Sequence, residues 1–102
     1  MSWNKFKAVR GTETLVIAGE VFEVRKSVTA KEVNDIIAKY RSDPNKIFRE
    51  LLRLIIVNPA PPENDEEFDE IIEEMDAAVK AKLETLVLEK TGLKEYFRIS
   101  TA

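Results

Sequence analysis

Apolar residues are most concentrated in the middle of the chain, between Ile47 and Val57. The first part of this run has helical spacing, since its apolar residues recur at intervals of one, three and four positions. The last part, Leu54 to Val57, contains no polar residue at all. A helix end that is apolar on every face must be covered by other elements or by a partner. The pattern therefore predicts a central helix that runs up to Asn58, where Pro59 stops it.

Alternating apolar residues predict strands before this helix. The segments 14–17 and 20–26 flank Ala18-Gly19, and two residues ending in glycine between such runs are typical of a tight hairpin. In that register, one face holds Leu15, Ile17, Phe22 and Val24 and is expected to meet the helices. The other face is expected to stand in water and holds Thr14, Val16, Val21, Glu23 and Arg25. A shorter alternating run, from Phe6 to Val9, predicts a further strand.

Two start signals predict helices on either side of residue 42. Thr29 and Glu32 fit a capping box, and apolar residues at helical spacing follow as far as Tyr40. Asp43 can cap the central helix, with Pro44 at its first position, where a missing N–H has no cost. Pro59 to Pro62 then form a stiff connector, which either joins two helices or serves as a proline-recognition ligand.

The acidic second half is expected to be helical from Asp65 to Thr91, either as one long helix or as two in phase, because Asp76 can cap a second one. Gly92 is placed as a left-handed cap. The tail after Gly92 has enough apolar residues that we expect it to pack against the rest of the chain. The predicted apolar stripe and tail comprise Phe68, Ile71, Ile72, Met75, Val79, Leu83, Leu86, Val87, Leu93, Tyr96, Phe97 and Ile99.

The order of these elements predicts an α+β fold in a single domain, 1–102. A small N-terminal antiparallel β-hairpin or meander, in 1–27, is expected to pack on a bundle of three to four helices in 28–102. A chain of 102 residues can bury roughly two-thirds of its unfolded surface in one core.

Composition narrows the possible functions. The chain has no cysteine and no histidine, so thiol chemistry, thiolate metal sites and the commonest general base are excluded. No apolar run is long enough to span a bilayer, and the first residues lack a signal-peptide core. We therefore expect a non-enzymatic protein of the cytoplasm that uses no cofactor and binds neither membrane nor nucleic acid.

Charge is unevenly distributed, since residues 1–62 carry a net +4 and residues 63–102 a net −7. Such blocks can attract each other within one molecule or head to tail between copies. The nine carboxylates from Glu63 to Asp76 are interpreted as a solvated helix start, with a partner-facing patch or a metal site as alternatives. Trp3 and Phe6 among basic residues are interpreted as a terminal strand edge that packs its rings, with a nucleic-acid patch as the alternative.

The apolar surplus of the central helix is the feature that most suggests binding. Core burial accounts for most of it, and an exposed strip that binds another protein accounts for the rest. The candidate protein-binding residues are Leu51, Leu54, Ile55 and Val57.

The succession of hairpin, capped helix, very apolar helix, proline break, acidic segment and final helix resembles the small tail assembly chaperones of long-tailed bacteriophages. The nearest matching stretches are Leu51 to Pro59 and the segment LETLVLEKTGL from Leu83 to Leu93. The resemblance spans roughly residues 14–93. The segments WNKFKAVRG at the N-terminus and KEYFRISTA at the C-terminus have no counterpart in that family.

This resemblance implies a protein that binds the tape measure protein and keeps it soluble in the host cytoplasm until the tail tube forms around it. It also implies weak, multi-copy association and therefore a weak homo-oligomer. The alternative is a structural neck or tail component of a phage or phage-like particle. Because the family has no motif of individual functional residues, the resemblance assigns none here.

Overall fold

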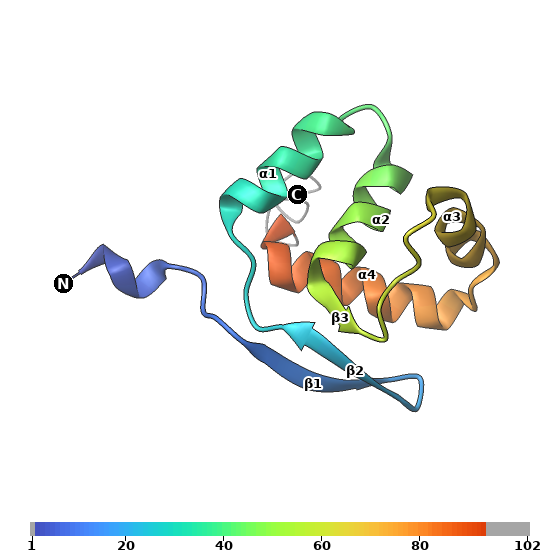
Figure 1. Cartoon of the computed structure of the whole chain (residues 1–102), viewed down its shortest axis with the longest axis horizontal. Helices are drawn as coiled ribbons and strands as arrows, with labels where there is room; N and C mark the ends of the chain where they lie inside the picture. Colours follow the sequence, from blue (N-terminus) through green and yellow to red (C-terminus); the bar gives the residue numbers. More distant parts are fainter. Residues whose placement is uncertain (1, 94–102) are drawn as a thin grey trace, which may run out of the picture.

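Residues 2–93 are described by the computed structural model, in which three short strands and four α-helices form an α+β fold (Figure 1). This confirms the predicted fold class. The elements are the 3-10 helix η1 (Trp3–Phe6), β1 (Thr12–Ile17), β2 (Glu20–Arg25), α1 (Ala30–Lys39), α2 (Pro44–Ile55), β3 (Ile56–Asn58), α3 (Asp65–Glu74) and α4 (Ala77–Thr91).

The hairpin forms in the predicted register. Leu15 pairs with Phe22, and Val16 pairs with Val21. Both turn residues have positive φ, 53° at Ala18 and 79° at Gly19, which is the backbone that the right-handed twist of a two-residue hairpin requires. The predicted inner face turns to the helices: Ile17 and Val24 are buried, and Leu15 and Phe22 pack against the core.

The first two long helices begin at their predicted caps. The Thr29 side chain accepts from the backbone N–H of Glu32 while Glu32 accepts from that of Thr29, which completes the capping box. The carboxylate of Asp43 accepts from the backbone N–H groups of Asn45 and Lys46, with Pro44 at the first helical position of α2.

The central helix ends earlier than its apolar pattern predicts. Helix α2 stops at Ile55, and the backbone of Ile56 is extended, with φ −85° and ψ 121°. The chain then continues as β3, which pairs antiparallel with β2, so the sheet order is β1-β2-β3. The run from Leu54 to Val57 is therefore a helix end joined to a strand. Ile56 pairs with Val24 and is buried, whereas Val57 and Asn58, at the register shift opposite Glu23, are exposed.

The strand predicted from Phe6 to Val9 does not form. Trp3–Phe6 is instead a single 3-10 turn, capped by the Ser2 side chain, which accepts from the backbone N–H of Asn4. The third strand of the sheet thus comes from residues 56–58 rather than from the N-terminus.

Of the two arrangements predicted for residues 65–91, the structure has the one with two helices. Met75 is extended and Asp76 caps α4 through the backbone N–H groups of Ala78 and Val79. Gly92 ends α4 in the left-handed conformation, with φ 77°. All members of the predicted stripe within these helices are buried or partly buried except Ile71, which is exposed. The predicted packing of Tyr96, Phe97 and Ile99 lies outside the described residues.

Helix α2 is the central element, because it contacts each of the other three α-helices as well as β3. Helix α4 crosses beneath it and also contacts β1 (Figure 1). The side chains of Val24, Leu51, Leu52 and Ile55 are fully buried where these elements meet. Among the described residues, no helix is both long and apolar enough to cross a membrane.

Candidate protein-interaction surface

The sheet carries exposed valines on the face turned away from the helices. We call this surface the outer sheet face, and it consists of Thr14, Val16, Val21, Glu23, Arg25 and Val57. Val16 and Val21 are directly paired across the hairpin and are 69% and 62% exposed. Val57 of β3 is 43% exposed. The strand period of two that turns Leu15, Ile17 and Val24 toward the helices places Val16 and Val21 on the other side.

The four predicted protein-binding residues have different positions. Leu51 and Ile55 lie in the core, with 2% and 0% of their surface exposed, so neither can reach a partner in this conformation. Leu54 is partly buried and packs against the core. Only Val57 is exposed, and it belongs to the sheet rather than to the helix. The strip of α2 that these residues were expected to form is therefore largely closed to a partner.

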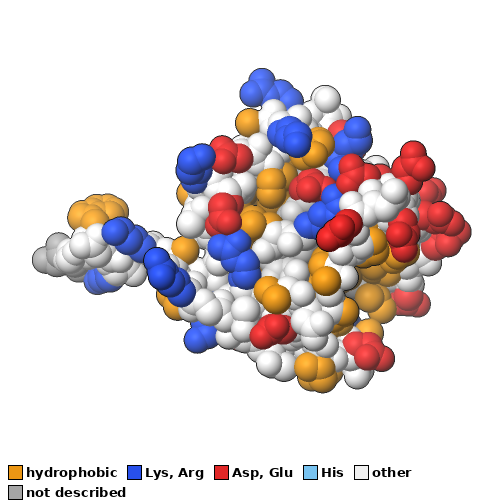
Figure 2. Space-filling view, in the orientation of Figure 1, with side chains coloured by type: hydrophobic (Ala, Val, Ile, Leu, Met, Phe, Trp, Pro, Cys, Tyr) orange, Lys and Arg blue, Asp and Glu red, His pale blue; other side chains and the backbone are white. Residues whose placement is uncertain are grey.

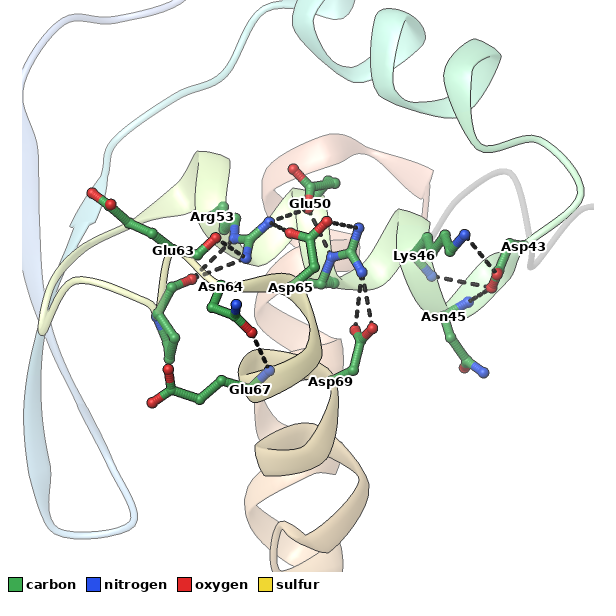
Figure 3. Close-up of polar contacts among 12 residues, drawn as sticks. Asp43, Asn45, Lys46, Glu50, Arg53, Glu63, Asn64, Asp65, Glu67 and Asp69 are labelled. Atoms are coloured by element: carbon green, nitrogen blue, oxygen red, sulfur yellow. Dashed lines mark hydrogen bonds and ion pairs between the residues drawn. The ribbon is translucent and has the colours of Figure 1, made fainter.

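Two arginines of α2, Arg49 and Arg53, bind the chain that follows β3 (Figure 3). Arg53 binds the proline connector and the start of α3. The guanidinium of Arg53 donates to the carbonyl oxygens of Pro62, at 3.2 and 3.0 Å, and of Glu63, at 3.1 Å. It also donates to the carboxylates of Glu50 and Asp65, each at 2.6 Å. Arg53 thereby ties the proline connector back to the helix, which restrains the strand at the other end of that connector.

Arg49 is only 2% exposed although it is charged. Its Nε donates to Glu50 at 2.8 Å, and its Nη1 donates to both oxygens of Asp69, at 3.1 and 3.0 Å. Burial by itself would lower the pKa of Arg49, but the hydrogen bonds to Glu50 and Asp69 outweigh burial and raise the pKa. The hydrogen bond from Arg53 in turn lowers the pKa of Asp65. Charge-assisted hydrogen bonds of this cluster therefore join α2 to α3.

Two further ion pairs hold the hairpin to the helices. Arg25, on β2, forms a two-pronged pair with Glu32 of α1, at 2.8 and 2.9 Å. This pair, with the backbone N–H of Thr29, lowers the pKa of Glu32 to about 2. Lys90, near the end of α4, donates to the Glu13 carboxylate at 2.8 Å and to the carbonyl oxygen of Lys26 at 3.1 Å. The sheet is therefore anchored along its inner side and at one end.

The acidic run is divided between two environments. Asp65 and Asp69 accept hydrogen bonds from Arg53 and Arg49, respectively. The remaining acidic side chains of α3 are exposed and form no such bond to these arginines. No group of three or more acidic, histidine or cysteine side chains in the described part of the chain is arranged to hold a metal ion. Asn64 caps α3 by accepting from the backbone N–H of Glu67.

Sequence reasoning missed the arginine cluster and the extent of the outer sheet face. The one local signal for the cluster was the position of Arg49 and Arg53, four residues apart in a helix rich in apolar residues that precedes an acidic one. Chemically, the outer sheet face offers valine methyl groups bordered by hydroxyl and charged groups, which suits contact with another protein. No family model, no curated protein and no solved structure matches the chain.

Proposed function

We propose that this protein is a non-enzymatic tail assembly chaperone of a long-tailed bacteriophage, which binds the tape measure protein in the host cytoplasm and keeps it soluble. The proposal begins from the resemblance of residues 14–93 to that family. It assigns no catalytic residue and no cofactor. The partner is a protein with long amphipathic helices, and the contact is weak and repeated along it.

The observation that carries the proposal is the exposed Val16–Val21 pair on a hairpin whose other face is buried. Directly paired β-branched residues form a continuous apolar strip across two strands. Val57 adds a third exposed apolar side chain in the same sheet. An apolar strip with a polar border is a surface that a partner can cover.

The small size of this strip fits a chaperone that must release its client. Three valines can bury only a modest apolar area, and the hydrophobic contribution is about 25 cal/mol per Å². A single contact of that size is too weak to hold a client permanently. Many copies along one long helical protein would cover it collectively and could still dissociate when tail tube subunits compete for the same surface.

Co-expression with the tape measure protein tests the proposal. We expect the wild-type chain to recover that protein in the soluble fraction and to be retained with it in a pull-down. The variant Val16→Lys/Val21→Glu replaces the apolar pair by an opposite-charge pair, which preserves cross-strand attraction and net charge. This variant should melt within a few degrees of wild type and lose most client recovery.

The matched control is Ile71→Thr, which removes an exposed apolar side chain from α3 instead of from the sheet. It should retain client recovery. If a well-folded wild-type protein never retains the tape measure protein, or if the sheet variant retains it as well as wild type does, the proposal is wrong.

The second candidate function is a structural neck or tail component, and a separate observation favours it. Residues Trp3–Phe6 project from the body of the molecule and expose two aromatic rings, as subunits that join neighbouring copies often do. The two functions predict different results. A structural component should self-assemble and leave the tape measure protein insoluble, whereas a chaperone should solubilise it.

A further inference from the structure

The N-terminal segment of residues 2–10, which we call the arm, extends from one end of the molecule (Figure 1). Trp3 and Phe6 are 83% and 61% exposed. Their rings meet edge to face with centroids 5.3 Å apart, and the Lys5 ammonium lies 5.3 Å from the centre of the Phe6 ring. The arm therefore presents an aromatic pair that the described part of its own chain leaves uncovered.

The arm is also basic. It carries Lys5, Lys7 and Arg10 and no acidic residue. No hydrogen bond or ion pair within residues 2–93 engages the charged ends of Lys7 and Arg10. A surface that fits the arm must therefore offer both an apolar floor and negative charge.

The opposite end of the molecule offers both features. A hollow of about 440 Å³ lies between α2, α3 and α4. Its volume is within the range of pockets that bind small molecules. Phe48 and Ile72 provide its apolar lining, Asp43, Asp69 and Glu73 its carboxylates, and Asn45, Lys46 and Lys80 also border it. Asp69 is engaged by Arg49, but no ion pair within the described residues engages Glu73.

Charge reinforces this match. Helix α3 carries seven acidic residues and no basic one. Figure 2 shows their side chains gathered at the end of the molecule where α3 lies, while basic side chains follow the arm at the other end. The arm is thus opposite in charge to the acidic helix α3 that borders the hollow, and the two lie at opposite ends of a molecule that is 47 Å long.

We propose that the arm of one molecule docks into the hollow beside α3 of a second copy, with Trp3 and Phe6 against Phe48 and Ile72. A second copy is the occupant because the arm, in its observed conformation, leads away from its own α3 (Figure 1). The two docking surfaces are different, so the contact is head to tail and adds further copies at either end instead of stopping at a dimer. Opposite charges make the association weaker at high salt.

Trp3 provides a direct probe, because it is the only tryptophan in the chain. Sedimentation velocity and tryptophan emission are measured on the full chain across a roughly hundredfold concentration series at low salt. We expect larger species at higher concentration, together with a shift of the Trp3 emission to shorter wavelength as the ring leaves water. A protein that stays monomeric throughout, or one that associates while the Trp3 emission stays constant, would overturn the proposal.

Two variants separate the docking surfaces. The arm variant, Trp3→Ser/Phe6→Ser, removes the rings, and the hollow variant, Glu73→Lys, reverses a charge at the acceptor. Each should weaken self-association at least about tenfold, because interface aromatics and paired charges dominate such contacts. All of these side chains are exposed, so both variants should melt as wild type does. Glu20→Lys, an equal charge change at the hairpin turn, is the matched control and should associate normally.

Mixing the two variants gives the most specific result. The arm variant keeps the hollow but contains no tryptophan, whereas the hollow variant keeps the arm and Trp3. A head-to-tail contact predicts that adding the arm variant restores the emission shift of the hollow variant and forms a one-to-one complex. Failure to restore the shift would refute the proposed pairing. The inference does not rest on the proposed function, because a strictly monomeric protein that retains the tape measure protein would overturn only the docking of the arm.

Discussion

At the scale of single residues, the buried Arg49 is the least expected feature of the molecule. It lies on α2 three residues before the buried Leu52 and four residues before Arg53. A buried charge is tolerated only when its hydrogen bonds are satisfied, and here Glu50, Asp65 and Asp69 surround it. Asp69 lies twenty residues further along the chain. Sequence reasoning cannot pair residues so far apart without knowing how α3 folds back.

We expect Arg49→Met to lower the free energy of unfolding by about 1–3 kcal/mol, measured by urea denaturation at neutral pH. The loss of stability stays moderate because Asp69 is partly exposed to water and because Arg53 still forms ion pairs with Glu50 and Asp65. Arg41→Met, at an exposed arginine between α1 and α2, is the control and should change stability by less than about 0.5 kcal/mol. An Arg49 variant as stable as this control would show that the cluster contributes nothing net.

At the scale of elements, the parts of the fold that were predicted are those with signals between near neighbours. The turn at Ala18-Gly19, the capping box of Thr29 and Glu32, and the caps at Asp43 and Asp76 each depend on residues within four positions of one another. The part that was missed is β3. A three-residue strand has no periodicity of its own, and Ile56 becomes a strand residue only because it pairs with Val24, far back in the chain.

The same contrast explains the candidate site. The outer face of the hairpin follows from alternation, so Val16 and Val21 could be placed there from the sequence. The four residues expected to bind a partner were assigned on the assumption of a helix up to Asn58. Because the chain becomes extended at Ile56, Leu51 and Ile55 are buried in the core, and Val57 is the one member of the four that is exposed.

Two single substitutions to aspartate, at positions two residues apart, test this change from helix to strand. Ile55→Asp should abolish cooperative folding, because an unpaired carboxylate in an enclosed site costs several kcal/mol against a total stability of roughly 5–15 kcal/mol. Val57→Asp should shift the melting temperature by only a few degrees, since its side chain is exposed on the outer sheet face. Thermal melts followed by circular dichroism check both. A cooperative, near-wild-type melt of Ile55→Asp would mean that α2 is misplaced.

At the scale of the whole molecule, ion pairs link elements that also share the apolar core. Arg25 and Glu32 join the hairpin to α1, Lys90 and Glu13 join it to α4, and Arg53 and Asp65 join α2 to the start of α3. These pairs lie at the edges of the core and not inside it. The stability of the assembled fold should therefore depend on pH through the carboxylates whose pKa is lowered on folding.

The direction of that dependence follows from Glu32 and Asp65. The pKa of Glu32 falls from an ordinary value of 4.5 to about 2 in the folded protein, chiefly through its hydrogen bond to Arg25, and the pKa of Asp65 is lowered from 3.8 by Arg53. A lowered carboxyl pKa contributes stability that is fully present above the unfolded pKa. That contribution is lost as the pH falls through the folded pKa, because the unfolded chain then binds protons more readily.

We therefore expect the urea midpoint to hold between about pH 7 and pH 5 and to fall steadily from pH 4.5 toward pH 2. Glu32→Gln should lower the midpoint at neutral pH and give a shallower fall below pH 4.5, because the variant has no carboxylate to protonate at that position. Asp35→Asn is the control, since it removes an exposed carboxylate from the same helix, and its profile should follow that of wild type. If the profiles of wild type and Glu32→Gln run parallel down to about pH 2, the Arg25–Glu32 pair does not hold the hairpin to α1.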